Sequence, residues 1–416
     1  MEIRRDRYLA KLVRKKKNGL IKVVTGIRRC GKSYLLFRLF HNYLLSSGVQ
    51  EDHIIEVALD DRSNKALRDP DAMLAFIKAA IKDEGDYYVI LDEVQYLKEF
   101  EDVLNSLLHI RNLDVYVTGS NSKFLSSDVI TEFRGRGDEI HLYPLTFSEF
   151  LSSYQGTEDA AWDDYLVYGG LPQTLTLTER EDKAEYLNAL FKNVYLLDIV
   201  ERHAVRNREE LDELVDVLAS AIGSYTSPNK LVRTVKSVKM KAITDKTIKT
   251  YMDYLVDSFL ISRASRFDVK GRKYIGSPSK FYFEDVGLRN ARLGFRQIEE
   301  THLMENIIYN ELRARGYNVD VGIVEHYETH EGKRTKKRLE VDFVATRGSE
   351  KCYIQSAFSL ASEEKINQEE RSLLCIPDSF RKIIVVGDNI KVRRDEKGLI
   401  TMGLREFLLY ENSLRL

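Results

Sequence analysis

The segment from residue 20 to about 145 alternates between short β-rich apolar runs and stretches with helical spacing, and this pattern strongly limits the folds open to the chain. The apolar runs are LIKVVTG at 20–26, IIEVAL at 54–59, YYVILDE at 87–93, DVYVTGS at 114–120 and EIHLYPL at 139–145. Residues 33–45, 72–81 and 100–110, between these runs, carry apolar side chains at helical spacing. Such alternation is typical of a parallel sheet with helices on both faces, so we predict an α/β fold.

The rest of the chain changes character twice. From about 147 to 260 the strand signal nearly disappears, and two turn clusters, YGGLP at 168–172 and YTSPN at 225–229, interrupt helical patterns. Beyond 260, short β candidates return and lead into a mixed α/β tail. We therefore predict three parts: an α/β core at 1–150, a helical extension at 151–290 and a second α/β domain at 291–416.

Composition excludes several classes of protein. The chain has 416 residues, of which 43% are hydrophobic and 31% charged, values that exclude wholesale disorder and collagen-like repeats. It has no apolar run of the roughly 18 residues that a membrane span needs, and no signal-peptide core at its start. Cys30, Cys352 and Cys375 lie far apart, without the spacing of a zinc site. We expect a cytoplasmic protein with reduced thiols and no membrane partner.

Residues 26–33, GIRRCGKS, match the phosphate-loop pattern GxxxxGK[ST] between an apolar β run and a helix, the context that the motif requires. Backbone N–H groups in such a loop surround phosphates, and the start of the helix adds positive potential. Lys32 would reach the β- and γ-phosphates of ATP, and Ser33 would ligate Mg²⁺. The simpler alternative is a glycine turn before an ordinary helix. The predicted nucleotide-binding residues are Gly26, Ile27, Arg28, Arg29, Cys30, Gly31, Lys32, Ser33 and Tyr34.

Asp92 and Glu93 follow the apolar run YYVIL, at the carboxyl end of a predicted strand. Ligands of open α/β sheets bind at this end of the strands. Asp92 would hold Mg²⁺, together with Ser33, and Glu93 would orient or deprotonate the attacking water. The alternative is a solvated acidic pair that ends a strand.

Four further residues are candidates for completing the site. Ser120 and Asn121 end the next β run, where a side chain would sense the γ-phosphate; a turn or a helix cap is an equally good explanation. Arg134 and Arg136 lie in the Gly-rich segment FRGRGDEI. Either arginine would stabilise phosphoryl charge in its own chain or in a neighbouring subunit of an oligomer, and the alternative is a solvated loop arginine.

The combination of GIRRCGKSYLL, VILDEVQ, TGSNS, FRGRGDEIHLYPLTFSEFL, YGGLP and KFYFEDVGLRNA resembles the prokaryotic AAA-type predicted ATPases that carry a C-terminal domain of unknown function. The resemblance covers nearly the whole chain. It implies a five-stranded P-loop core, a helical extension, a winged-helix segment and a nuclease-like terminal fold. It implies no particular substrate beyond ATP.

The formal net charge of the whole chain is −1, but the segment 228–282 is basic. It contains 13 Lys and Arg residues and 4 Asp residues, which gives a net charge of +9. Two helices and a β-hairpin in this segment would form a winged helix that binds duplex DNA. Lys246, Thr247 and Lys249 would then face a major groove. The alternative is a winged helix that serves packing only. The residues predicted to touch phosphates are Lys236, Lys239, Lys241 and the hairpin tip, Lys270, Gly271, Arg272 and Lys273.

The tail has the α-β-β-β order of a restriction-nuclease-like core, with Glu305 on the helix and Asp342 on a strand in acidic positions. Gln355 and Ala357 stand where this chemistry needs an acid and a lysine, and neither replaces them. Glu340 and Asp342 serve equally well as hydrogen-bonding residues without metal. A degenerate fold that binds DNA or protein fits better than an active nuclease.

We therefore predict a Mg²⁺-dependent ATPase that binds ATP and ADP and couples its nucleotide state to duplex DNA or a protein partner. One alternative is a nucleotide-dependent regulatory protein with negligible turnover. A second is a Mg²⁺-dependent nuclease that relies on Asp342.

Overall fold

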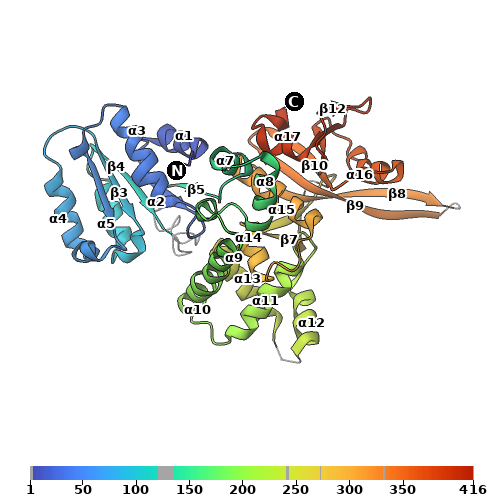
Figure 1. The fold of residues 1–416 in the computed structure, drawn as a ribbon, viewed down its shortest axis with the longest axis horizontal. Helices are drawn as coiled ribbons and strands as arrows, with labels where there is room; N and C mark the ends of the chain where they lie inside the picture. The colour runs from blue at the N-terminus through green and yellow to red at the C-terminus, as the bar shows by residue number, and fades with distance from the viewer. Residues whose placement is uncertain (1–2, 120–134, 240–242, 272, 331–332, 416) are drawn as a thin grey trace. The chain divides into compact units, whose positions relative to one another are not determined.

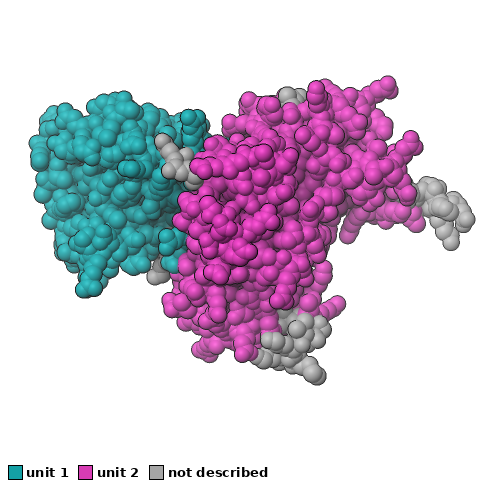
Figure 2. Space-filling view, viewed as in Figure 1, with its two compact units in different colours: residues 1–144, 257–259 teal, residues 145–256, 260–416 magenta. Residues whose placement is uncertain are grey.

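The chain forms two compact units, which Figure 2 distinguishes by colour. The structure is a computed structural model that describes residues 3–119, 135–239, 243–271, 273–330 and 333–415, without the side chains of 235–239, 328–330 and 333–334. Unit 1 comprises Met1–Pro144 and Asp257–Phe259, and unit 2 comprises Leu145–Val256 and Leu260–Leu416. The three-part division expected from the sequence stays a prediction.

Unit 1 contains the predicted parallel sheet (Figure 1). Its strands hydrogen-bond in the order β2-β3-β4-β1-β5, and every pairing is parallel. The carboxyl ends of the strands therefore share one edge, where polar side chains from different strands meet. The strands are β1 (Ile21–Thr25), β2 (Ile54–Ala58), β3 (Tyr87–Asp92), β4 (Leu113–Thr118) and β5 (Gly137–His141).

Helices cover both faces of this sheet, as the alternation in the sequence predicts. Alternate residues of each strand point to opposite faces, so Val115 and Val117 join a core with α4 (Pro70–Ala80) and α5 (Phe100–Leu107). Tyr116 points the other way, and its ring packs 4.5 Å from that of Phe40. Phe40 belongs to a continuous helix of α2 (Lys32–Tyr34), a π-helical stretch (Leu35–Phe40) and α3 (His41–Ser46). The helix α1 (Asp6–Lys15) precedes β1.

Unit 2 begins with helices, as expected for residues 147–260. The turn YGGLP after α8 packs against Asp285, whose carboxylate accepts a hydrogen bond from the Gly170 N–H at 2.7 Å. A Cβ atom at Gly169 would lie 2.3 Å from Asp285 Oδ1, so this position has no room for a side chain. Burial raises the pKa of Asp285 to about 6. The helices that precede the terminal domain are α7 (Phe147–Ser153), α8 (Glu158–Tyr168), α9 (Arg180–Leu190), α10 (Leu197–Arg202), α11 (Arg208–Ser220), α12 (Pro228–Lys239), α13 (Asp245–Asp257) and α14 (Val286–Arg292).

The second sheet of the molecule lies in unit 2, and its strand order is β12-β13-β11-β10-β9-β8-β6-β7. The predicted hairpin of the basic segment is formed by β6 and β7, which pair in antiparallel fashion. It joins this sheet because β6 also pairs with β8, in parallel. The hairpin is therefore built into the terminal sheet, and the winged-helix fold expected for this segment stays a prediction. The remaining bounds are β6 (Ile261–Asp268), β7 (Lys273–Phe283), α15 (Glu300–Ala314), β8 (Asn318–His330), β9 (Lys333–Arg347), β10 (Glu350–Ala357), α16 (Glu363–Leu374), β11 (Arg381–Val386), β12 (Arg393–Arg394), β13 (Ile400–Gly403) and α17 (Leu404–Leu409).

None of the helices in the described residues is both long enough and apolar enough to cross a membrane. All three cysteines are free thiols, with Cys30 and Cys352 buried and Cys375 half-buried.

Candidate functional site

The phosphate loop connects β1 to the helix that starts at Lys32, and its shape depends on two glycines. A Cβ atom at Gly26 would lie 2.2 Å from the carbonyl oxygen of Leu142, so only glycine fits there. Gly31 adopts a left-handed conformation with φ of 99° and precedes the first helical residue. Arg29 has a φ of 65°, which bends the loop between the glycines. The loop therefore has the compact course that a phosphate cradle requires.

Lys32 is 5% exposed, and its ammonium group lies against the loop itself. It donates hydrogen bonds to the carbonyl oxygens of Gly26 at 2.9 Å and Ile27 at 3.1 Å. Both acceptors are neutral. The positive charge of Lys32 is thus held at the centre of the loop by partners that do not neutralise it.

Ser33 and Asp92 lie next to each other at the carboxyl edge of the sheet, close enough for the Ser33 hydroxyl to act on the Asp92 carboxylate. Asp92 is 6% exposed, and its carboxylate also accepts a hydrogen bond from the Thr118 hydroxyl. Burial raises the pKa of Asp92, while the hydrogen bonds from Thr118 and Ser33 work in the opposite direction. The structure therefore brings together the two residues predicted to hold a metal, and both offer the oxygen donors that Mg²⁺ prefers.

Glu93 follows Asp92 in a left-handed conformation with φ of 49°, an uncommon geometry for glutamate. Its backbone N–H donates to the Thr118 hydroxyl at 2.9 Å, and its carboxylate accepts from the Gln95 side chain. Strained backbone of this kind is concentrated at functional sites. Thr118 thus orients both acidic residues with one hydroxyl group.

Sequence reasoning missed Thr118 and Asp60 as parts of this edge. Thr118 ends β4, and Asp60 follows β2 and raises the pKa of Asp92 by charge repulsion. The available signal was position, because a polar residue directly after a parallel strand lies beside the ends of its neighbours. The predicted candidates next to Thr118, Ser120 and Asn121, lie outside the described residues.

Several predicted loop residues have side chains that point away from a ligand. Ile27 and Cys30 are buried, and the Cys30 thiol donates to the Leu142 carbonyl at 3.4 Å. The Tyr34 hydroxyl accepts a hydrogen bond from the N–H of Ile3 at 3.3 Å. Any contact of these residues with a nucleotide would therefore involve their backbone, and this stays a prediction, as does a role for Arg28 and Arg29.

Arg136 lies at the opposite edge of the sheet from the phosphate loop. Its carbonyl accepts from the N–H of Ile21, the first residue of β1, at 2.9 Å, and its guanidinium donates to Asn105 on α5 at 3.4 Å. The loop follows the other end of β1, about 16 Å away at the usual rise of a strand. The structure thus does not bring Arg136 to the loop of its own chain, and a role toward a neighbouring subunit stays a prediction. Arg134 lies outside the described residues.

The basic segment has the predicted element order α12, α13, β6, β7. Thr244 caps α13 as expected, accepting a hydrogen bond from the N–H of Thr247 at 3.1 Å. Lys246 and Lys249 are exposed on the first turns of α13, and Thr247 is half-buried. The side chains of Lys236 and Lys239, and the whole of Lys241 and Arg272, lie outside the described residues.

Part of the positive charge of this segment is used inside the protein. Lys270, at the hairpin tip, donates to the carbonyl of Glu325 at 2.8 Å, and Lys230 donates to that of Tyr225 at 2.9 Å. Arg263 donates to the Ser279 hydroxyl at 3.0 Å. Lys270 is exposed and uses one of its three N–H donors in this bond, so a contact of the hairpin tip with phosphates stays a prediction. Lys273 remains exposed.

A buried lysine occupies the middle of the acidic residues predicted for the terminal domain. Lys280 of β7 lies 2.8 Å from Glu305, 2.6 Å from Glu340 and 3.7 Å from Asp342, measured from its nitrogen to the carboxylate oxygens. Burial works against its charge, but the carboxylates outweigh burial and raise the pKa of Lys280. Burial, and then repulsion by Glu305, raise the pKa of Asp342 to about 8. We call these four residues the Lys280 cluster.

The Lys280 cluster does not have the form of a metal site. Its ammonium group occupies the space between the carboxylates, and Asp342 also accepts from the Ser356 N–H at 2.8 Å. Gln355 accepts from Ser372 at 3.4 Å, and Ala357 is a buried core residue. The described part of the chain contains no group of three or more His, Cys, Asp or Glu side chains arranged to hold a metal ion. The lysine missing from β10 is thus supplied by β7, in a position that compensates charge.

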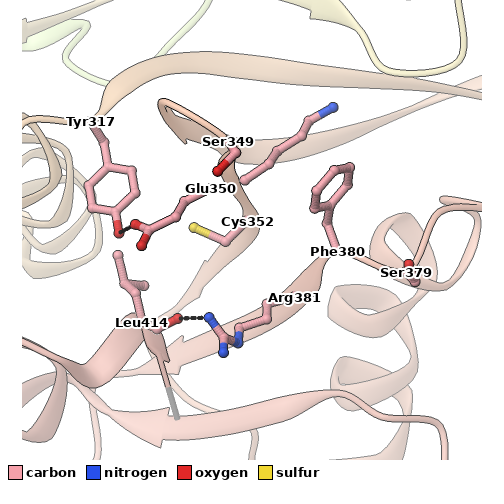
Figure 3. Close-up of a pocket in the computed structure, with 9 residues that line it drawn as sticks. Tyr317, Ser349, Glu350, Cys352, Ser379, Phe380, Arg381 and Leu414 are labelled. Carbon is pink, nitrogen blue, oxygen red and sulfur yellow. Dashed lines mark hydrogen bonds between the residues drawn. The ribbon is translucent and has the colours of Figure 1, made fainter.

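A pocket of about 310 Å³ opens where β10 and β11 begin, in unit 2 (Figure 3). In its wall the Tyr317 hydroxyl donates to Glu350 at 3.0 Å, and Arg381 donates to the Leu414 carbonyl at 3.1 Å. Glu350 also pairs with Arg347 and Arg415, each at 2.8 Å. Hydrogen bonds from Arg347 and then Tyr317 lower the pKa of Glu350 to about 2. The charged groups of the pocket therefore fasten the C-terminal residues to the sheet.

Comparison with known protein families agrees with the geometry of unit 1. Residues 18–151 match the family model of the AAA domain, a range that contains all five strands and the phosphate loop. The fold and the site thus define an AAA-type P-loop ATPase domain. Residues 159–299 match a domain of unknown function (DUF8612), and residues 300–407 match another (DUF4143). These two matches assign no activity, so the winged-helix and nuclease-like folds stay predictions.

Two relatives match almost the whole chain. An uncharacterized protein of Haemophilus influenzae is 30% identical over 391 residues, which cover 92% of this chain and 93% of that protein. The chain belongs to the same family as this H. influenzae protein. The uncharacterized protein MJ1544 of Methanocaldococcus jannaschii is 27% identical over 388 residues, covering 89% of this chain and 81% of that protein.

Solved structures give weaker likenesses. The Aeropyrum pernix ORC1 protein in complex with DNA is 12% identical, with 70% of this chain and 92% of that chain covered and a TM-score of 0.29. AMPPCP-bound DnaA from Aquifex aeolicus is 14% identical, with 60% and 86% covered and a TM-score of 0.29. Because both scores lie below 0.5, neither likeness carries an argument about this chain.

Proposed function

We propose that this protein hydrolyses ATP in a Mg²⁺-dependent reaction and that its nucleotide state controls the binding of duplex DNA or a protein partner. The observation that carries the first part is the burial of Lys32 in the loop and of Asp92, next to Ser33, at the same edge of the sheet. A glycine turn before an ordinary helix gives no reason for a buried lysine and a buried aspartate at the same edge. The AAA-domain match supports the same conclusion.

Each residue of the site has a distinct task in this proposal. Lys32 exchanges its hydrogen bonds to loop carbonyls for the β- and γ-phosphates of ATP. Ser33 and Asp92 hold Mg²⁺, which when bound neutralises phosphate charge. Thr118 fixes Asp92 and the backbone of Glu93, so that the Glu93 carboxylate orients the attacking water and accepts its proton.

Glu93→Gln tests hydrolysis, and Glu99→Gln is its matched control. Both glutamates have left-handed backbones, with φ of 49° and 48°, but Glu99 precedes α5 and takes no part in the proposed chemistry. We expect Glu93→Gln to lower phosphate release roughly 10²- to 10⁴-fold while ATP binding persists, and Glu99→Gln to change neither. If wild-type protein binds ATP but releases no phosphate, with or without DNA, it is the regulatory protein of negligible turnover instead.

The exposed Lys246 and Lys249 support the DNA part of the proposal. If these lysines bind DNA phosphates, duplex binding releases counterions, and we expect the affinity to fall steeply between about 50 and 200 mM salt. The double variant Lys246→Ala/Lys249→Ala should weaken binding and reduce the salt dependence. Lys65→Ala/Lys78→Ala removes the same charge from exposed positions in unit 1 and serves as control. No binding at low salt, or equal losses in both double variants, would exclude DNA and leave a protein partner.

Two further features belong to the proposal. Arg134 or Arg136 acts on the ATP of a neighbouring subunit, which makes the active form an oligomer. The protein acts in the cytoplasm, where ATP and Mg²⁺ are available, and its three free thiols fit a reducing compartment.

A further inference from the structure

Three residues far along the chain belong to unit 1. Asp257–Phe259 is part of unit 1, although the rest of α13, up to Val256, and β6 after it belong to unit 2. The half-buried ring of Phe259 packs against the ring of His141 at the end of β5, with 4.4 Å between ring centroids. The connection between the two elements proposed to meet DNA is therefore anchored on the ATPase sheet.

His141 and Leu142 also contact the phosphate loop and the residue before it. The His141 ring nitrogen Nδ1 lies 3.1 Å from the Thr25 hydroxyl, and the Leu142 N–H donates to the Thr25 carbonyl at 2.8 Å. The Leu142 carbonyl accepts from Cys30 and leaves no room for a side chain at Gly26. One dipeptide thus contacts both the phosphate loop and Phe259.

The backbone of Phe259 supports a special role for this position. Its φ is 57°, in the left-handed region that bulky residues rarely adopt. Such a conformation persists only where the surroundings determine it. Lys246 and Lys249 precede Phe259 on α13, and the basic hairpin tip follows it on β6 and β7, so a movement at Phe259 would reach both.

We propose that Phe259 is the positioning residue that couples occupancy of the phosphate loop to the conformation of α13 and the β6–β7 hairpin. This inference rests on the proposed function and specifies its regulation. When the loop closes on phosphates, Thr25 and Gly26 press on His141 and Leu142. Because packed interiors repack in discrete steps, the displacement passes to Phe259 and to the ends of α13 and β6.

Hydrogen exchange of the full-length protein tests the coupling, with Mg²⁺ and either ADP or a non-hydrolysable ATP analogue as probes. In wild type we expect the two nucleotides to give amide exchange rates within 245–268 that differ by about fivefold or more, the lower end of common allosteric couplings. Phe259→Asn removes the ring but tolerates the left-handed backbone. This variant should bind both nucleotides and lose the difference, whereas Phe259→Tyr should keep it.

Phe295→Asn is the matched control. Phe295 also has a φ of 57°, is half-buried and packs against an aromatic ring, that of Tyr168 at 5.7 Å, but it lies wholly within unit 2. This variant should retain the nucleotide-dependent difference. Should Phe259→Asn fold poorly, His141→Leu removes the same ring contact from the opposite side and should abolish the difference equally.

Each outcome decides the matter. A full difference in Phe259→Asn or His141→Leu, or its equal loss in Phe295→Asn, overturns the coupling. The coupling also fails if wild type binds both nucleotides and exchanges identically with each. Absence of nucleotide binding in wild type overturns the proposed function itself, which distinguishes the two failures.

Discussion

Lys32 in unit 1 and Lys280 in unit 2 are both buried ammonium groups, with 5% and 4% exposure, but their surroundings are opposite. Lys32 donates to two neutral carbonyls, and among the described residues no carboxylate lies within ion-pair distance of it. Lys280 is surrounded by Glu305, Glu340 and Asp342. The first lysine keeps its charge available for an anion, whereas the second has its charge compensated by the protein.

The difference shows that the partners of a buried cation distinguish a ligand-binding role from a structural one. A ligand site needs charge that the folded protein leaves uncompensated, and a structural site needs partners that compensate it. Lys32 and Lys280 therefore make opposite predictions for activity and stability, and the following variants test this contrast.

The largest expected effect is on hydrolysis, in Lys32→Met. Removing the charge at the phosphates should lower the rate of ATP hydrolysis by roughly 10³-fold or more. The free energy of unfolding should change by only about 1 kcal/mol, because the lost hydrogen bonds go to neutral carbonyls. Steady-state phosphate release and urea unfolding measure the two effects. A Lys32→Met variant that keeps its hydrolysis rate but is strongly destabilised would show that Lys32 has a structural role instead of a ligand-binding one.

Lys280→Met should show the opposite pattern. It leaves the buried Asp342 and the half-buried Glu305 and Glu340 without their cation, which costs about 3 kcal/mol of stability. Hydrolysis by the folded fraction should be unchanged. Trp162 on α8 is the only tryptophan of the chain and lies in unit 2, so its fluorescence during urea unfolding reports the relevant unit. Adding Glu305→Gln and Asp342→Asn to Lys280→Met should restore part of the stability, and a failure to do so would weaken the charge argument.

Stability should also depend on pH through Asp342. Its pKa is raised to about 8 in the folded protein, against an ordinary value of about 3.9, so the folded state binds this proton more tightly. The free energy of unfolding therefore falls as pH rises from about 4 to about 8, by at most about 1.4 kcal/mol per pH unit. Asp342→Asn should remove this slope when Trp162 fluorescence is followed at several pH values. An unchanged slope would mean that another group carries the titration.

The smallest expected effect comes from Thr118→Val, which keeps the shape of the side chain and removes the hydroxyl. Asp92 and the Glu93 backbone then lose a shared partner, and hydrolysis should fall by about tenfold, while the free energy of unfolding falls by roughly 1–2 kcal/mol. Thr25→Val on β1 removes a hydroxyl that bonds β5 residues instead. It should lower stability without the same loss in hydrolysis, and equal activity losses in both would deny Thr118 a specific role.

The sequence predicts the phosphate loop well because the loop is local. Gly26, Gly31, Lys32 and Ser33 fall within eight residues, and their spacing alone encodes the turn and the helix start. Asp92 follows from strand order, since the carboxyl ends of parallel strands share an edge. Thr118 was not predicted because threonine at the end of a strand is common. Only the structure shows that its hydroxyl forms hydrogen bonds with both Asp92 and the Glu93 backbone.

The Lys280 cluster was not predictable in the same way. Glu305 and Asp342 were recognised by their order, but the compensating lysine comes from β7, a strand expected to belong to the hairpin of a winged helix. Pairing of β6 with β8 brings β7 into the terminal sheet, and no local pattern encodes this pairing of distant strands. The sequence thus identified the acidic residues and missed the cation that determines their role.

The strand order of unit 1 has a consequence for synthesis on the ribosome. β1, the first strand of this sheet to be made, lies between β4 and β5, the last two, so its hydrogen bonds on the β5 side form only after residue 141 has left the exit tunnel. Phe259 is translated more than a hundred residues later, and only then can its ring pack against that of His141. Unit 1 of a nascent chain therefore stays incomplete until much of unit 2 has been translated, and an expression fragment that ends near residue 150 would lack the Phe259 ring that packs on His141.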